Sequence, residues 1–472
     1  MKPGEDGPID PEALGPAISE AGRQPPAAAA SLAGSFSSRV LAYFLSQVLT
    51  AGLGLFNGFL LAHLIGPEGR GDYYLLTFYP TTLMSLGQLG LPQAFTFFSA
   101  RRQFDGLISR TIAFALVIGS FLFLATVVLL PELQETFLRG LEPIAILVGV
   151  AALPFMLNAN FTTGIVVGRQ SAFGMALIYV AGNALTTVLI LLLVGALGLG
   201  VWGALVGFVL SFVAYAAAFF VLSLRVTRQL TSEGAVATSR LLAYGLQLFP
   251  ANISQFFAAR TDVFLLAALL AEPSAPIGYY SLAVGIAELV FLFPNAVSTF
   301  FFPHVAAGKR EDSHRQVGAV SRVTLLLTAF GAIALAPLAT LAIVLFIPTF
   351  TPALPALFVL LAGTIAMGPT RVLGGYLAGL RRPGLASAVN LSALAANVAL
   401  NVLFIPRFGI IGSAVAVLVS SVISSLVCSA IAARLSSEPL HAFWLPRMSD
   451  IRFAVDTARD LAVRILRPRS AG

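Results

Sequence analysis

Apolar residues fill nearly all of the chain between residues 36 and 435, and short clusters of glycine, proline and charged residues interrupt them repeatedly. A helix needs about 20 mostly apolar residues to cross the hydrocarbon core of a bilayer. Dividing the chain at these clusters predicts twelve stretches of sufficient length. They are residues 37–65, 73–100, 107–130, 143–167, 172–197, 201–224, 241–270, 277–303, 317–347, 353–380, 385–405 and 410–434. The pattern therefore predicts an all-α integral membrane protein with 12 transmembrane helices.

The composition agrees with a chain whose solvent is mostly lipid. Hydrophobic residues make up 58% of it and charged residues 10%, whereas soluble domains carry about 25% charged residues. The single cysteine, Cys428, excludes an internal disulfide framework and a thiolate metal cluster. The four histidines are scattered, and the sequence holds neither a P-loop motif nor a GxSxG nucleophile elbow. We therefore expect no metal, no cofactor and no enzymatic activity.

Basic residues alternate from one loop to the next. The loops that follow even-numbered stretches hold twelve of them: Arg101, Arg102, Arg110, Arg169, Arg225, Arg228, Arg240, Lys309, Arg310, Arg315, Arg381 and Arg382. The loops that follow odd-numbered stretches hold Arg70, Arg139 and Arg407. Because loops rich in lysine and arginine stay in the cytoplasm, both termini are predicted to be cytoplasmic. The net charge of +7 is then an orientation signal beside anionic lipid, and no nucleic-acid partner is expected.

Two tails flank the apolar part of the chain. Residues 1–36 are rich in proline, glycine, alanine and acidic residues, which predicts a disordered cytoplasmic tail. Residues 436–472 are predicted to form a cytoplasmic basic tail. An apolar stripe over residues 448–469 favours an amphipathic helix on the inner membrane surface. A disordered basic segment is the alternative there.

The two halves of the chain resemble each other. The segment "GPEGRGDYY" (66–74) returns as "EPSAPIGYY" (272–280), and "LPQAFTFF" (91–98) returns as "FPNAVSTFF" (293–301). We predict an N-lobe of six helices, a cytoplasmic linker and a C-lobe of six helices, at residues 37–227, 228–240 and 241–435. Six helices per repeat give both lobes the same orientation, and parallel repeats of this kind hold the substrate near the midplane between them. The expected architecture is a two-lobe alternating-access transporter.

Four charged residues lie well inside the predicted helices of the second half: Arg260, Asp262, Glu288 and Arg371. A charge at the bilayer centre costs at least about 2.5–3.5 kcal/mol, so each needs a partner or a water-filled cavity. Residues two apart on a helix do not face each other, so we expect separate partners for Arg260 and Asp262. One interpretation is that the four charges form structural ion pairs within the second lobe.

The other interpretation is a substrate cavity. Arg260 and Arg371 would bind an anionic group there, because a guanidinium binds phosphate oxygens bidentately and keeps its charge. Glu288 would be a proton or cation site, and Asp262 an ion-coupling or a structural charge. Amides of the first half are candidates for contacts to sugar hydroxyls, although hydrogen bonds between helices explain them equally well. These amides are Asn57, Gln88 and Asn158.

Several segments resemble a known family. "LLAHLIGPEGRGDYYLL" (60–76) and "LGLPQAFTFF" (89–98) resemble the amino-terminal signature of the polysaccharide-exporting, Wzx-like (O-antigen-type) flippases in the MATE-like (MOP) exporter superfamily. "RTDVFLLAALLAEPSAPIGYYSLA" (260–283) resembles the seventh helix of that family with its aspartate. The segment 377–416, with its paired asparagines and "IPRFGIIG", is similar to the carboxy-terminal block of the family.

The resemblance implies a MATE-like fold with two lobes around a central cavity. It also implies a flippase that moves an undecaprenyl-pyrophosphate-linked oligosaccharide to the outer leaflet of the bacterial cytoplasmic membrane for surface polysaccharide export. The expected partners are this lipid-linked oligosaccharide, the bilayer and polysaccharide-assembly enzymes. By similarity Asp262 is a recurring position of the family, while the cationic positions vary, so Arg260 and Arg371 are not carried over from it.

Three other functions compete with this one. A cation-coupled exporter of drugs or organic cations has the same fold, but its cavity favours acidic and aromatic residues. Here Arg260 and Arg371 balance Asp262 and Glu288. A lipid II flippase usually has two further helices. A membrane enzyme that polymerises or ligates lipid-linked sugars needs a sizeable outer loop with catalytic side chains, and the predicted outer loops are short and lack histidine.

Overall fold

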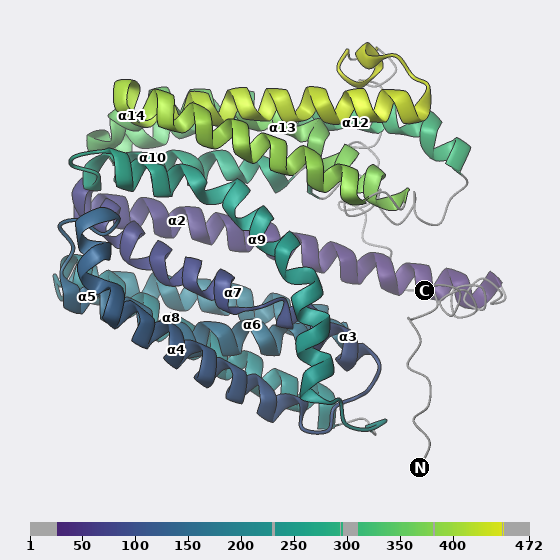
Figure 1. Cartoon of the computed structure of the whole chain (residues 1–472), viewed down its shortest axis with the longest axis horizontal. Coiled ribbons are helices and arrows are strands. Elements are labelled where there is room, and N and C mark those ends of the chain that lie inside the picture. Colours follow the sequence, from purple (N-terminus) through teal and green to yellow (C-terminus); the bar gives the residue numbers. More distant parts are fainter. Residues whose placement is uncertain are drawn as a thin grey trace, which may run out of the picture.

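The computed structural model describes residues 26–228, 232–292, 294–295, 310–380, 383–445 and 447, with the side chains of most residues from 46 onwards. Every regular element in these ranges is a helix. The helices form two groups with α2 between them, and α9 crosses from one group to the other (Figure 1). Most of both predicted tails lies outside the described residues. In the structure α2 already begins at Pro26, inside the range expected to be a disordered tail.

The helices of the first half cover nearly all of its length. They are α2 (Pro26–Gly87), α3 (Leu91–Ala100), α4 (Leu107–Thr136), α5 (Pro143–Val150), α6 (Leu153–Gly168), α7 (Ala172–Leu189), the π-helical η3 (Ile190–Ala196) and α8 (Gly200–Arg228). The helices of the second half follow. They are α9 (Thr238–Leu269), α10 (Ser274–Glu288), η4 (Leu289–Phe291), α12 (Arg310–Phe346), η5 (Pro348–Ala353), α13 (Leu354–Gly379), α14 (Pro383–Ser436) and η6 (Leu440–Phe443).

The long helices α2 and α14 each fold back at a glycine. Gly66 in α2 and Gly409 in α14 have positive φ angles of 67° and 56°, which glycine adopts without steric cost. In α14 the Asn397 side chain donates a hydrogen bond of 3.2 Å to Ser420 Oγ, 23 residues further on. Those two residues would lie about 35 Å apart in a straight helix. The chain therefore reverses at Gly409, and α14 is a pair of helices that pack on each other.

Nine stretches of the described chain are long and apolar enough to cross a membrane. They are Ser46–Gly87, Leu107–Thr136, Pro143–Gly168, Ala172–Ala196, Gly200–Arg228, Ser274–Phe291, Val317–Phe346, Pro348–Leu377 and Ala388–Ser436. The first and last of these each run through two predicted helices. The predicted range 241–270 is helical as α9 but is not among the nine. The all-helical membrane fold is thus confirmed, while the count of twelve and the division into two repeats stay predictions.

The two halves pack on each other mainly through α2 with α10 and α3 with α9, and α2 also contacts α9 and η5. One continuous apolar core includes residues from both halves, among them Leu75 and Phe78 of α2, Val263 of α9 and Ile286 of α10. The Phe78 and Phe264 rings meet edge to face, with their centroids 4.9 Å apart. The halves are therefore joined by a buried apolar contact at the end of the molecule where each half carries a Tyr-Tyr pair.

Glycines bring the backbones of the two halves into direct contact. A Cβ atom at Gly71 would lie 1.7 Å from a backbone oxygen of α10, and a Cβ at Gly278 would lie 2.0 Å from the Pro67 carbonyl oxygen. Real Cβ contacts are essentially never shorter than 3.0 Å. A second approach joins α3 and α9, where a Cβ at Gly90 would lie 2.1 Å from the carbonyl oxygen of Gly245. No larger residue fits these positions while the helices stay where they are.

The predicted linker is attached to the first half. The Glu233 backbone N–H donates a 2.8 Å hydrogen bond to the Arg102 carbonyl oxygen, and the Phe104 N–H donates a 3.1 Å bond to Ser232 Oγ. The Arg110 guanidinium donates to the Val236 carbonyl oxygen. These bonds hold residues 232–240 of the linker against the loop that follows α3 and the first turn of α4.

Candidate functional site

Arg260 and Glu288, both described by the structure, form an ion pair across two helices. Arg260 Nη1 of α9 lies 3.0 Å from Glu288 Oε1 of α10. Both side chains are partly exposed, by 31% and 45%, so the pair borders open space rather than the packed core. This contact is the one expected from the structural interpretation of the charges. It also leaves both groups within reach of a molecule that enters the space beside them.

Asp262 lies on the same helix but has separate partners, as the helical spacing predicts. Its side chain is 8% exposed. The Tyr280 hydroxyl donates a 2.6 Å hydrogen bond to Asp262 Oδ2, and the Val263 backbone N–H donates a 3.0 Å bond to Oδ1. Ser413 Oγ donates in turn to the Tyr280 hydroxyl at 3.3 Å. This chain connects α9, α10 and α14, which is the geometry of a structural contact.

A cavity of about 620 Å³ opens among α9, α10, α13 and α14. We call it the second-half cavity, because all of its lining residues lie between Gln255 and Cys428. Three charged residues line it: Asp262, Glu288 and Arg371. Arg260 does not line it, although its partner Glu288 does. The sequence predicted a cavity between the two lobes, whereas this one lies within the second half.

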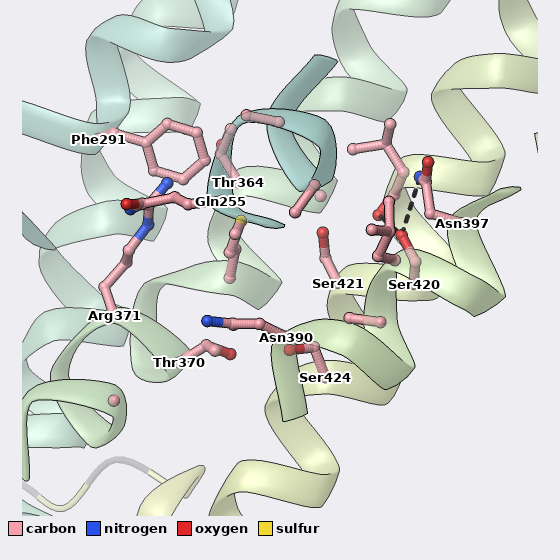
Figure 2. A pocket seen from close by; sticks show the side chains of 18 of the residues that line it. Gln255, Phe291, Thr364, Thr370, Arg371, Asn390, Asn397, Ser420, Ser421 and Ser424 are labelled. Atoms are coloured by element: carbon pink, nitrogen blue, oxygen red, sulfur yellow. Dashed lines mark hydrogen bonds between the residues drawn. The ribbon is translucent and has the colours of Figure 1, made fainter. Parts of the chain in front are cut away.

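Arg371 occupies one side of the second-half cavity. It belongs to α13, and the centre of its guanidinium lies 5.1 Å from the centroid of the Phe291 ring. At that distance the ring face attracts the cation. Figure 2 shows Arg371, Phe291 and Gln255 together at this side of the cavity. The guanidinium therefore has a defined position from which it can meet an anionic group.

Neutral polar side chains form much of the remaining wall. They are Thr364 and Thr370 of α13 and Asn390, Asn397, Ser420, Ser421 and Ser424 of α14. The fold-back at Gly409 brings Asn397 and Ser420 into contact, so both arms of α14 contribute to one surface. Sequence reasoning missed this surface. The signal was present in the seven-residue spacing of Asn390 and Asn397 and in the serine-rich run 420–425, which place polar groups on one helix face.

The amides predicted as substrate contacts lie elsewhere, and two of the three bond to neighbouring helices. Thr187 Oγ1 donates a 2.6 Å hydrogen bond to Asn57 Oδ1, which joins α7 to α2. Asn158 Nδ2 donates to Thr111 Oγ1 at 3.4 Å, which joins α6 to α4. Gln88 Nε2 donates to the Ser85 carbonyl oxygen at 3.3 Å. The structure does not bring these three side chains together with Arg371. Asn57 and Asn158 instead make the hydrogen bonds between helices that were the alternative explanation for these amides.

Arg70 was expected in an outer loop and instead points into the protein. Its Nε donates a 3.2 Å hydrogen bond to Ser281 Oγ of α10, and its Nη1 donates to the Gly58 carbonyl oxygen. It lines a second cavity, of about 270 Å³, between α2 and α10. We call this the interface cavity, and Glu288 lines it as well as the second-half cavity. A single arginine in a short loop carries no sequence signal for such a role.

The comparison with known families identifies the chain. The profile of the family described as "Polysaccharide biosynthesis protein" matches residues 38–309, more than half of the chain. The chain belongs to this family. The match includes the first half, the linker and the segment with Arg260, Asp262 and Glu288, and it ends before Arg371.

Relatives of this polysaccharide biosynthesis protein agree with the expected superfamily. The probable low-salt glycan biosynthesis flippase Agl15 of Haloferax volcanii is 26% identical over 219 residues, which is 45% of this chain and 43% of that protein. An inward-facing multidrug MATE transporter of the MOP superfamily aligns with a TM-score of 0.69 at 16% identity, over 82% of this chain and 95% of that one. The lipid II flippase MurJ, in an inward closed conformation, has the same score and identity over 92% and 94%. The structural matches show that the fold is that of the MOP superfamily. All three relatives are named as flippases or transporters, in line with the expectation of a non-enzymatic protein.

Proposed function

We propose that the protein is a flippase that moves a polyprenyl-(pyro)phosphate-linked oligosaccharide across the bacterial cytoplasmic membrane by alternating access. The observation that carries this proposal is a cavity, set in apolar helices, whose wall of neutral amides and hydroxyls also holds Arg371 and two carboxylates that already have partners, Asp262 and Glu288. An anionic phosphate and sugar hydroxyls are the complementary ligand groups. The family of the chain and the glycan flippase it resembles over part of its length support the same substrate class.

Two arginines are candidates for contact with the anionic group. Arg371 lines the second-half cavity and is oriented by Phe291. Arg260 is partly exposed and is held by Glu288, which lines both cavities. A phosphate that approaches Arg260 competes with the Glu288 carboxylate for the same guanidinium. Glu288 therefore acts as an internal substitute for the substrate anion, and its release accompanies substrate binding.

The proposed transport path follows from the twelve-helix, two-repeat topology with both termini in the cytoplasm. The contacts at Gly71 and Gly278 lie at the end that the charge pattern assigns to the outside. The halves also meet through α3 and α9, at Gly90 and Gly245, near the end that the charge pattern assigns to the cytoplasm. We propose that the substrate enters beside this contact from the cytoplasmic side, where assembly enzymes deliver the lipid-linked oligosaccharide. Separation of the halves at Gly71 and Gly278 then opens the path to the outer leaflet, while the lipid tail stays in the bilayer.

A deletion strain tests this function. We expect lipid-linked oligosaccharide to accumulate in the inner leaflet and surface polysaccharide to be lost, both restored by the wild-type chain. The variant Arg371→Ala should restore export at least about tenfold less well, because a hydrogen bond to a charged group contributes about 1.5–3 kcal/mol. The control Arg407→Ala removes an exposed arginine outside both cavities and should restore export fully.

The opposite result identifies another transporter. An unchanged lipid-linked pool with unchanged surface polysaccharide, together with new sensitivity to cationic compounds, would mean that the protein exports drugs or organic cations. Accumulation of the peptidoglycan precursor lipid II, with surface polysaccharide intact, would mean a lipid II flippase.

A further inference from the structure

The second-half cavity contains polar groups that the protein itself does not satisfy. Thr370 is 7% exposed, and its hydroxyl oxygen is buried without a hydrogen-bond partner in the described part of the chain. Ser420 donates to the Val417 carbonyl oxygen of its own helix at 3.0 Å. Among the described residues, its neighbours Ser421 and Ser424 form no such bond, although they are only 6% and 4% exposed. Three hydroxyls that line one cavity are therefore available to another molecule.

Such groups are costly inside a membrane protein. A hydroxyl removed from water without a new hydrogen bond costs about 1–3 kcal/mol in proteins, which applies to the buried Thr370 oxygen. The Ser421 and Ser424 hydroxyls face the cavity and bond to whatever fills it. A ligand that enters this cavity gains most if it brings both donors and acceptors, because hydroxyls and amides do both. Sugars carry hydroxyls on every side of the ring. The wall therefore fits a sugar better than a lipid chain.

The charged groups of the cavity favour the same ligand. Glu288 is paired with Arg260, and Asp262 accepts hydrogen bonds from Tyr280 and the backbone. Both carboxylates thus have partners, whereas the groups without one are neutral. In Figure 2, Thr370, Asn390 and Ser424 extend toward the same region, with Arg371 at the neighbouring side of the cavity. An anion beside Arg371 and a sugar against these neutral groups would occupy adjacent space.

We propose that the second-half cavity is a carbohydrate subsite. It holds the phosphate-proximal sugar of the lipid-linked oligosaccharide against Thr370, Asn390, Ser421 and Ser424, with the phosphate toward Arg371. The volume of about 620 Å³ is that of a small-molecule pocket, so the cavity takes the first sugars and not a long glycan. The inference rests on the proposed function, and it adds that sugar recognition occurs within the second half rather than between the halves.

The chain carries a natural reporter for this subsite. Cys428 is the one cysteine of the sequence and lines the same cavity with only 1% of its surface exposed, so its labelling is slow and reports on access through the cavity. The full-length protein in lipid nanodiscs is treated with methyl methanethiosulfonate, and the extent of labelling is followed by intact-protein mass spectrometry. Two probes are compared: lipid-linked oligosaccharide extracted from the cells that produce the protein, and undecaprenyl pyrophosphate, which lacks sugar. We expect the extracted oligosaccharide to slow labelling about tenfold or more and undecaprenyl pyrophosphate to slow it far less, because each sugar hydrogen bond adds about a fivefold gain in affinity.

A matched set of variants tests the hydroxyl wall. The double variant Ser421→Ala with Ser424→Ala should raise the oligosaccharide concentration needed for half-protection about 20-fold, since two hydrogen bonds are lost. The control Ser425→Ala changes a neighbouring serine that is fully buried, does not line the cavity and has no hydrogen-bond partner among the described residues. It should leave half-protection unchanged. The labelling rate without lipid shows whether each variant keeps its fold.

The outcomes separate the subsite from the function. If native mass spectrometry shows both lipids bound while Cys428 is labelled at the unliganded rate, the subsite is wrong and the flippase proposal stands. Equal protection by undecaprenyl pyrophosphate would assign the cavity to the lipid pyrophosphate and overturn the sugar assignment. Unchanged half-protection in the double serine variant would do the same. Absence of binding by either lipid, together with normal surface polysaccharide in the deletion strain, would remove the proposed function itself.

Discussion

The glycine contact between α2 and α10 allows a sharp test, through the substitution Gly278→Ala. The added Cβ would lie 2.0 Å from the Pro67 carbonyl oxygen, and the two backbones must separate until that distance reaches at least 3.0 Å. Alanine is otherwise about 1 kcal/mol better than glycine within a helix. Overpacking of this kind costs about 1–3 kcal/mol. If the contact exists in only one of two transport states, that penalty shifts their ratio about 5- to 150-fold.

The same helix supplies the control, Gly285→Ala. A Cβ at Gly285 has no neighbour within 4 Å, so this variant keeps the helix-propensity gain without the clash. The transport state is measured by the distance between two spin labels. The labels are attached to cysteines placed at two exposed positions, Glu68→Cys and Glu272→Cys, after the native cysteine is removed by Cys428→Ser. Gly278→Ala should add a population with a longer distance and lower the thermal stability. Gly285→Ala should do neither.

One result would refute this reasoning. If Gly278→Ala keeps the wild-type distance distribution and melting temperature, the halves do not touch at this level in the membrane. The backbone contact would then not be the closure that we infer for the outer side.

Three further predictions concern other contacts. Tyr280→Phe leaves one oxygen of the buried Asp262 without its 2.6 Å donor and should destabilise the protein by about 1–3 kcal/mol. Thermal unfolding measures this loss, with Tyr279→Phe as the control. Equal melting temperatures of the two variants would show that Asp262 needs no donor. Glu288→Gln removes the anionic partner of Arg260 and should tighten binding of undecaprenyl pyrophosphate several-fold. Thermophoresis of the protein in nanodiscs measures the affinity, with Glu272→Gln as the control. Unchanged affinity in Glu288→Gln would restrict the ion pair to a structural role. Arg110→Ala removes the bond to the Val236 carbonyl oxygen and should speed proteolysis of the linker in inside-out vesicles. Faster cleavage in right-side-out vesicles instead would reverse the predicted orientation.

The sequence by itself determined that most of the chain lies in lipid and that its regular elements are helices. Hydropathy and helix length are local properties, so runs such as 107–130 and 201–224 predicted α4 and α8 almost to their ends. Segment similarity, also local, predicted the family that the profile match at residues 38–309 confirmed. The spacing of Arg260 and Asp262 on one helix was enough to assign them different partners, because residues two apart point in different directions.

Only the tertiary structure decided which side chains meet. The partner of Arg260 is Glu288 on another helix, and Arg70 turns inward to Ser281 across the two halves. The wall of the second-half cavity exists because α14 reverses at Gly409 and places Ser420 beside Asn397. Such contacts depend on the rotation and the relative height of packed helices. Hydropathy does not encode these quantities, because a polar residue inside an apolar run reads the same whether it faces a neighbouring helix, as Asn57 does, or a cavity, as Asn390 does.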